Sequence, residues 1–184
     1  MLRILGLMAV VLTASVQAAE QSVFQDYHLS VYRDAQQSAE HIELFTKMPD
    51  REVFFGIRCS SQSPFPMLEV LLFNDEVMSE LPRLLQADYR IDGQAGDPAF
   101  KWQAVLKPHN TFEEVSNRVR IELDPQSVKS MNVMQEGYQS LLENLKQGEK
   151  LEVTFSHRAL GKPTYAFSLR GLKKLLEPYQ DVCK

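Results

Sequence analysis

The sequence predicts an α+β fold: an antiparallel β-sandwich or partly open β-barrel of about eight strands, with one long helix and a C-terminal helix tied back by a disulfide. Three observations predict it. Short runs of alternating apolar and polar residues recur along the chain, as in strands with one buried face. Residues 127–146 repeat apolar side chains at steps of three and four. The chain has two cysteines, Cys59 and Cys183, one of them close to its end.

The first residues have the pattern of a cleaved signal peptide. Arg3 precedes an apolar run at residues 4–13, which is too short to cross a bilayer, and small residues at Val16 and Ala18 suit a cut before Ala19. The alternative is an anchor that stays in the membrane. We expect residues 1–18 to be removed and residues 19–184 to form one exported α+β domain.

The alternating runs are assigned to strands, with six or seven before the long helix and two after it. They occupy residues 27–33, 41–48, 53–59, 67–73, 87–93, 101–106, 118–124, 151–158 and 164–169. Two segments are ambiguous: residues 74–85 could form a short helix or a crossing loop, and residues 112–117 a helical turn or irregular chain.

Two helices are expected. In residues 127–146 the apolar stripe ends before Gly148, and Gly137 inside it indicates close packing on a strand. In residues 172–183, Leu172, Leu176 and Cys183 lie at helical spacing, and Pro178 is expected to kink or restart the helix.

Cys59 and Cys183 favour a structural disulfide, because an exported chain meets an oxidising environment. Cys59 falls on the inward face of its strand, where a helix packed on the sheet could reach it. The bond would close a loop of about 125 residues, worth roughly 5 kcal/mol at most. A reactive thiol or a metal pair is the alternative, although a zinc site needs three or four ligands.

The charge balance argues against some partners. The chain has 20 Lys and Arg and 24 Asp and Glu, for a net charge of −4, and no basic run. We therefore expect no nucleic-acid partner. No other stretch is apolar enough to cross a membrane, so we expect no membrane insertion after signal removal, and without a cofactor-binding motif we expect no cofactor.

The histidines and carboxylates give no strong catalytic pattern. His28 and His41 lie on adjacent predicted strands and could form a metal half-site, but a surface pair is more common. His157 is interpreted as a hydrogen-bonded histidine at the core edge. Ser156 precedes it on the opposite face of the strand, so the two cannot form a nucleophile–base pair. No catalytic residue is assigned.

Arginines give the candidate binding residues. Arg58, Arg90, Arg120 and Arg158 alternate with apolar positions on predicted strands. On neighbouring strands they would line a polar face suited to carboxylate or phosphate. The alternative, which we favour, is an ordinary set of cross-strand ion pairs with Asp88, Asp92, Glu122 or Glu152.

The order of several short motifs resembles the TagO/VasI type VI secretion-associated periplasmic proteins. These motifs are Phe55-Gly-Ile-Arg-Cys59, Leu68-Glu-Val-Leu-Leu72, Tyr89-Arg-Ile-Asp-Gly93 before Trp102, and Phe167-Ser-Leu-Arg-Gly-Leu172 before Cys183. The chain is also similar to small exported β-rich proteins of the invasion-associated IalB-like group. Residues 74–86 depart from the pattern, and a second cysteine pair found in some relatives is absent.

The resemblance implies a Gram-negative periplasmic accessory protein with a Cys59–Cys183 bridge and no catalysis. Its partner would be another envelope protein. Two alternatives stay open. The chain could inhibit an envelope enzyme through the loop at residues 60–66, or it could be a cell-wall hydrolase that uses His157 or a carboxylate pair. The sequence does not identify the ligand or the oligomeric state.

Overall fold

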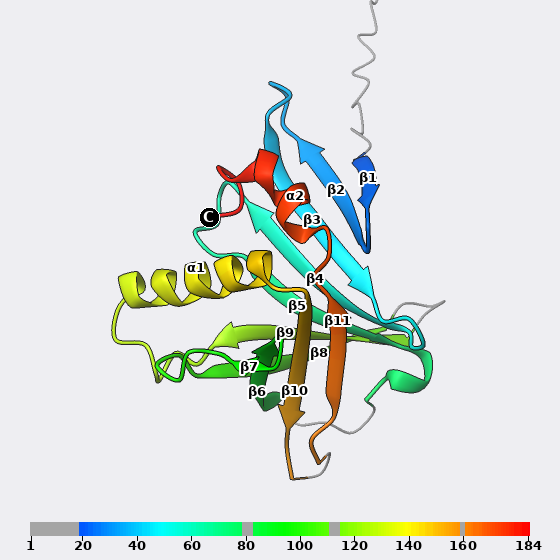
Figure 1. Ribbon diagram of the computed structural model, residues 1–184, viewed down its shortest axis with the longest axis vertical. Coiled ribbons are helices and arrows are strands. Elements are labelled where there is room, and N and C mark those ends of the chain that lie inside the picture. The colour runs from blue at the N-terminus through cyan, green and yellow to red at the C-terminus, as the bar shows by residue number, and fades with distance from the viewer. Residues whose placement is uncertain (1–18, 79–82, 111–114, 159–160) are drawn as a thin grey trace, which may run out of the picture.

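The computed structural model describes residues 19–78, 83–110, 115–158 and 161–184 (Figure 1). The expected signal peptide, residues 1–18, lies outside this part of the chain, as do residues 112–114 of the segment that could have formed a helical turn at residues 112–117.

The described residues form one open, antiparallel sheet of eleven strands, so the fold is β-rich and the expected number of about eight strands was too low. The spatial order is β1-β2-β3-β4-β5-β9-β8-β6-β10-β11, with β7 paired to β6. The strands are β1 (Glu20–Phe24), β2 (Tyr27–Arg33), β3 (Ala39–Lys47), β4 (Val53–Ser60), β5 (Met67–Phe73), β6 (Leu84–Ile91), β7 (Gln94–Ala95), β8 (Trp102–Asn110), β9 (Val115–Leu123), β10 (Lys150–Ser156) and β11 (Thr164–Ser168).

The additional strand residues lie where alternation is weak. β1 is a mostly exposed edge strand, and β7 has only two residues, so neither produces a buried face. β8 runs on to Asn110, and β9 begins at Val115, because the two strands pair along their whole length. Residues 115–117 are therefore strand rather than a helical turn, and Asn74–Glu76 forms a short 3-10 helix before β6.

One face of the sheet is buried along nearly every strand, as the alternation predicted. The sheet curls so that the inward face of β11 lies against that of β4, and the ring centroids of Phe55 and Phe167 are 5.6 Å apart. In Figure 1, β10 and β11 cross the direction of β4 and β5. Curling lets one sheet bury its own apolar face. The fully buried side chains include Tyr27, Ile42, Leu44, Phe55, Ile57, Leu68, Leu72, Leu145, Leu151, Phe155, Phe167 and Leu172.

Helix α1 (Met131–Gln147) covers the inner side of the curled sheet. Ser130 caps its first turn by accepting a hydrogen bond from the backbone of Val133, so the helix begins later than the expected residue 127. Gly137 allows close packing, because a Cβ there would come within 2.8 Å of Leu123 on β9 and 2.9 Å of Phe100. This confirms the contact with a strand that Gly137 indicated.

Helix α2 (Leu172–Leu176) is shorter than the expected helix over residues 172–183. A 3-10 turn at Glu177–Tyr179 follows it, because Pro178 cannot donate the hydrogen bond that would continue the α-helix. No helix within the described ranges is both long and apolar enough to cross a bilayer.

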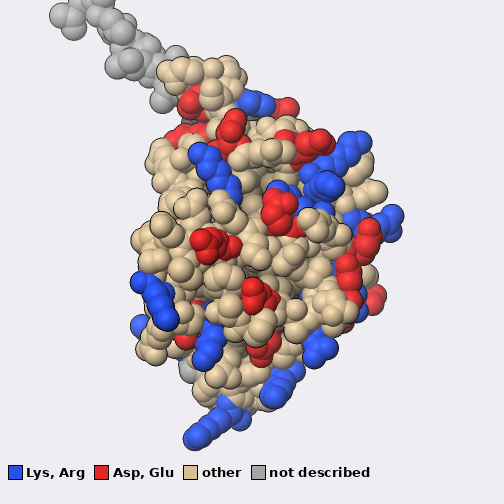
Figure 2. All heavy atoms as spheres, turned by 60° about the vertical axis from the view of Figure 1, so that its left-hand side comes forward, with Lys and Arg blue, Asp and Glu red and all other residues tan. Residues whose placement is uncertain are grey.

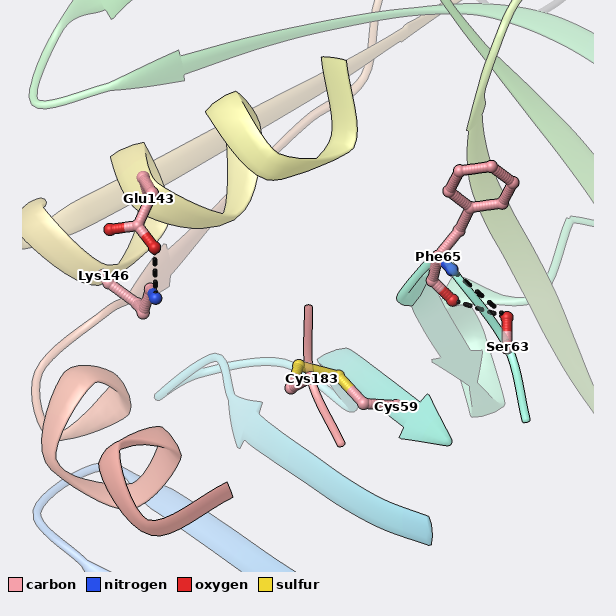
Figure 3. The surroundings of a disulfide bond; sticks show 6 residues. All are labelled: Cys59, Ser63, Phe65, Glu143, Lys146 and Cys183. Carbon is pink, nitrogen blue, oxygen red and sulfur yellow. Dashed lines mark hydrogen bonds and ion pairs between the residues drawn. A yellow bond between two sulfur atoms is a disulfide. The ribbon is translucent and has the colours of Figure 1, made fainter. Parts of the chain in front are cut away.

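The disulfide between Cys59 and Cys183 is confirmed. It joins the inward face of β4 to the chain after α2, with the two Cα atoms 4.9 Å apart (Figure 3). Cys59 and Cys183 are 2% and 6% exposed, so the bond lies within the core. The alternatives of a reactive thiol and a metal pair are thereby excluded for the oxidised protein.

The two edges of the sheet approach each other beside α2 without forming a ladder. Ser168 at the end of β11 donates a hydrogen bond of 2.6 Å to Asp26, in the turn between β1 and β2. Gly171 has φ +97° and lies so close to this turn that a Cβ would come within 2.5 Å of the Phe24 carbonyl oxygen. A residue with a side chain does not fit at position 171, because the positive φ favours glycine and a Cβ would clash with the Phe24 carbonyl.

Replacing Cys59 and Cys183 together by Ala should lower the free energy of unfolding by about 2–5 kcal/mol, because the unfolded chain loses a long covalent loop. Urea unfolding followed by the fluorescence of Trp102 measures the difference. The reduced wild-type protein should resemble the double variant. Equal stability of the double variant and the oxidised wild type would contradict a stabilising role for the bond.

Candidate functional site

The four arginines named from the sequence do not form one face. Arg58 and Arg120 line a pocket beside the disulfide, whereas Arg90 and Arg158 line a groove on the other side of β8. Arg158 lies in the turn after β10, not on the strand. The expected arginine face therefore divides into two separate hollows.

Arg58 and Arg120 belong to a chain of ion pairs across the outer face of β3, β4, β5 and β9. Arg58 Nε lies 2.8 Å from Glu43 on β3, and its Nη2 lies 3.5 Å from Glu69 on β5. Arg120 pairs with Glu122 on its own strand at 2.7 Å. Both arginines form ion pairs, as the favoured interpretation predicted, but the pair of Arg120 lies within β9 and is not a cross-strand pair. The expected partner was correct for Arg120 and wrong for Arg58.

Glu69 is the buried member of this chain, at 6% exposure. It lies directly opposite Arg120 in the β5–β9 register and within ion-pair distance of Arg58, so it is placed between two guanidinium groups. A carboxylate removed from water needs such partners.

The helix-covered pocket, as we name the hollow beside the disulfide, has a volume of about 390 Å³. It lies where β5 begins at Met67 while its neighbours β4 and β9 continue to Ser60 and Leu123. Helix α1 covers it through Met134 and Tyr138. The lining residues are Arg58, Cys59, Ser60, Ser63, Phe65, Pro66, Met67, Arg120, Ile121, Glu122, Leu123, Pro125, Met134 and Tyr138.

Tyr138 provides a polar atom in the wall of this pocket. Its hydroxyl oxygen accepts a hydrogen bond of 3.3 Å from the backbone N–H of Leu123, where a longer β5 would have supplied a carbonyl. Burial raises the pKa of the Tyr138 phenol, so the hydroxyl keeps its proton at neutral pH. The ring also contacts Trp102, with centroids 5.4 Å apart at 89°.

The loop at residues 60–66, proposed above as an inhibitory loop, forms one wall of the helix-covered pocket. Phe65 stacks on Tyr138 with ring centroids 5.2 Å apart, and Pro66 is buried. Ser63 accepts from and donates to the backbone of Phe65 (Figure 3). The apolar part of the loop is therefore directed into the protein.

The β6–β8–β10 groove, the second hollow, has a volume of about 1400 Å³ and follows β6 from Leu84 to Arg90. Because β6 has eight residues, the groove is roughly 25 Å long. Its lining residues are Leu84, Leu85, Gln86, Ala87, Asp88, Tyr89, Arg90, Ala95, Gly96, Asp97, Pro98, Phe100, Lys101, Trp102, Gln103, Asp124, Thr154, Ser156, His157, Arg158, Gly161 and Lys162.

Four cationic side chains of the groove have no ion pair to another described residue: Arg90, Lys101, Arg158 and Lys162. Arg90 lies opposite Glu152 in the register and contributes to lowering the pKa of that carboxyl, after the larger effect of Lys150. Asp97 and Asp124 are engaged by backbone N–H groups of Ala99 and Gln126. Asp88 also lines the groove, so its lining holds four cationic and three anionic side chains, and the cationic ones form no close ion pair within the described residues.

The floor of the groove is polar and carries several uncharged side chains beside Asp88. Gln86 of β6 lies between Gln103 of β8 and Ser156 of β10 in the register, and Thr154 lies beside Asp88. Amide and hydroxyl groups in this row can both donate and accept hydrogen bonds. No aromatic ring lies fully exposed among the described lining residues.

The structure does not bring the histidines together. His28 lies opposite Phe45 and His41 opposite Tyr32, so the proposed histidine half-site is wrong. His157 lies in the groove beyond the end of β10 and exchanges backbone hydrogen bonds with Gly161. Within the described ranges there is no group of three His, Cys, Asp or Glu side chains that could hold a metal ion.

Sequence analysis missed Lys101, Lys162 and Tyr138. Lys101 was only the first residue of the strand predicted at 101–106, Lys162 lies in a connecting segment where alternation gives no signal, and Tyr138 was counted only as an apolar residue of the helix. Only the pairing of β6 with both β8 and β10 brings the lysines to the same groove as Arg90.

Comparison with known proteins adds no relative: no protein-family model, no curated protein and no solved structure matches the chain.

Glu69→Gln should lower the free energy of unfolding by about 1–3 kcal/mol, because it removes the charge placed between Arg58 and Arg120. Glu52→Gln is the matched control. Its exposed partner Lys47 lies 2.5 Å away, and its loss should change stability by less than about 0.5 kcal/mol. Chemical denaturation compares the two. Equal effects would contradict a special role for the buried carboxylate.

Proposed function

We propose that this protein is a non-enzymatic accessory protein of an oxidising envelope compartment, and that it holds an extended acidic segment of a partner protein in the β6–β8–β10 groove. One observation carries the proposal. Four cationic side chains line one groove without an ion pair to another described residue, whereas Arg58 and Arg120 elsewhere on the sheet are paired.

Charge complementarity favours an acidic occupant. Guanidinium and ammonium groups that form no ion pair attract carboxylates. Binding a carboxylate costs them little free energy, because no existing ion pair must be broken. On the face shown in Figure 2, Lys and Arg are mixed with Asp and Glu, so the charge of that face is not of one sign. With four cationic and three anionic lining side chains, the groove suits a short acidic segment better than a long polyanion.

The floor of the groove favours a peptide. Gln86, Gln103, Thr154 and Ser156 can form hydrogen bonds with the backbone amides of an extended chain. A sugar polymer commonly stacks on exposed aromatic rings, and Trp102 is only 8% exposed. The groove length of roughly 25 Å would accommodate about seven extended residues.

The compartment is part of the proposal. The buried Cys59–Cys183 disulfide is compatible with an oxidising environment, and residues 1–18 have the pattern of an export signal. The motif resemblance over residues 55–183 suggests a component of a type VI secretion machine in the periplasm as the partner.

The two alternative functions have less support. An inhibitor needs a protruding rigid loop, but Phe65 and Pro66 pack into the protein. A hydrolase needs converging catalytic groups. Ser156 and His157 both line the groove, yet adjacent positions at the end of a strand direct their side chains apart.

The proposal predicts that Arg90→Glu combined with Arg158→Glu weakens the binding of an acidic peptide at least about tenfold. The probe is a fluorescein-labelled peptide of alternating Glu and Thr, measured by fluorescence anisotropy. Binding to the wild type should weaken as salt is raised, because the cations are exposed. A peptide of alternating Lys and Thr should not bind.

Arg118→Glu is the matched control, because Arg118 is an arginine of the outer sheet face outside the groove. It should leave acidic-peptide binding unchanged. Equal weakening by Arg118→Glu would indicate a general charge effect and overturn the groove as the site. An anionic oligosaccharide such as oligogalacturonate serves as the third probe, and tighter binding of that probe would assign the groove to glycans instead.

A further inference from the structure

We propose that the helix-covered pocket is a second binding site, for a small apolar molecule whose polar end is an uncharged carbonyl group. This site is separate from the groove, since the two hollows share no lining residue. The inference rests on the shape of the pocket, on the donors in its wall and on its charge balance.

The size and lining of the pocket match those of small-molecule sites. Its volume of about 390 Å³ falls in the range of about 300–1000 Å³ typical of ligand pockets. Phe65, Met67, Leu123 and Met134 supply apolar walls from four different segments. Methionine side chains adapt to the shape of an apolar ligand.

The polar groups at this pocket are mainly donors. The Tyr138 hydroxyl accepts from Leu123, so its own proton remains available to a ligand. Arg58 and Arg120 also line the pocket, and each guanidinium carries more N–H groups than its glutamate contacts use. A ligand that satisfies these donors must carry an acceptor such as a carbonyl oxygen.

The charge balance favours a neutral acceptor. Arg58 and Arg120 are two cations, and the carboxylates of Glu43, Glu69 and Glu122 are already associated with them. A ligand carboxylate would add a negative charge beside these five side chains, whose net charge is already negative. A ligand ammonium would offer no acceptor to Tyr138 or to the arginines. An amide or ester carbonyl accepts hydrogen bonds without either cost.

The test compares octanamide, octanoate and octylamine, which share the same tail and differ in the charge of the polar end. Trp102 is the single tryptophan of the chain and contacts Tyr138, so its fluorescence reports occupancy of the pocket. Octanamide should bind saturably with a Kd of roughly 0.1–5 mM. Octanoate and octylamine should bind about tenfold more weakly.

Variants locate the site. Met134→Trp fills the pocket and should abolish octanamide binding, measured by calorimetry because it adds a second tryptophan. Arg120→Met should weaken binding about fivefold, whereas Arg118→Met, on the same strand but outside the pocket, should not. Circular dichroism and urea unfolding establish that each variant folds.

Three results would overturn the inference: no saturable octanamide binding, octanoate or octylamine binding as tightly as octanamide, or octanamide binding that persists in Met134→Trp. Arg90→Glu with Arg158→Glu should leave octanamide binding intact. The outcome at the pocket is therefore independent of the outcome with acidic peptides at the groove.

Discussion

The pairing of β6 with β10 is the contact on which the closing of the core and the β6–β8–β10 groove depend. It joins residues about sixty positions apart, such as Ile91 and Leu151, and attaches the β10–β11 hairpin to the rest of the sheet. Without it, the inward face of β11 would have no way to reach β4, and the core around Phe55 and Phe167 would remain open to water. The same pairing places Arg90 and Arg158 along one groove. Contacts this distant in the chain are also slow to form.

Residues of one type have different roles on this sheet because their neighbours differ. Arg58 faces a carboxylate on an adjacent strand, and Arg120 faces one on its own strand. Both arginines therefore form ion pairs within the sheet. Arg158, Lys101 and Lys162 lie where the sheet gives way to turns. Asp124 is the backbone neighbour of Lys101, but no close ion pair joins their side chains. Strand register therefore decides which charged side chains become neighbours within the sheet. Cationic side chains without an ion pair are found where the strands end.

Sequence patterns predicted the local structure well wherever one face of a strand is buried. The alternation in residues 27–33 reproduces β2, and the inward direction of Cys59 led to the correct disulfide. The helical period predicted α1, but Ser130, which caps it, shows where it begins. β1 was missed because four of its five residues are exposed and therefore give no apolar period.

The candidate sites could be predicted only in part, because they depend on which strands are neighbours. Alternation shows that Arg90 points outward, but it does not reveal that β6 lies between β8 and β10. The partner chosen for Arg58 was wrong for the same reason: Glu43 becomes its neighbour only through the β3–β4 register. Tyr138 carried no signal, because its hydroxyl matters only where β5 stops short of β9.

The separation of 124 positions between Cys59 and Cys183 has a consequence for biogenesis. Seven of the eleven strands and both helices begin between these two residues, so the thiols cannot meet until nearly all of this architecture has been synthesised and brought to the right order. Oxidation is therefore a late event in maturation. The bond can form only after nearly the whole chain has been synthesised, so it cannot guide any folding that begins while the chain is still being made.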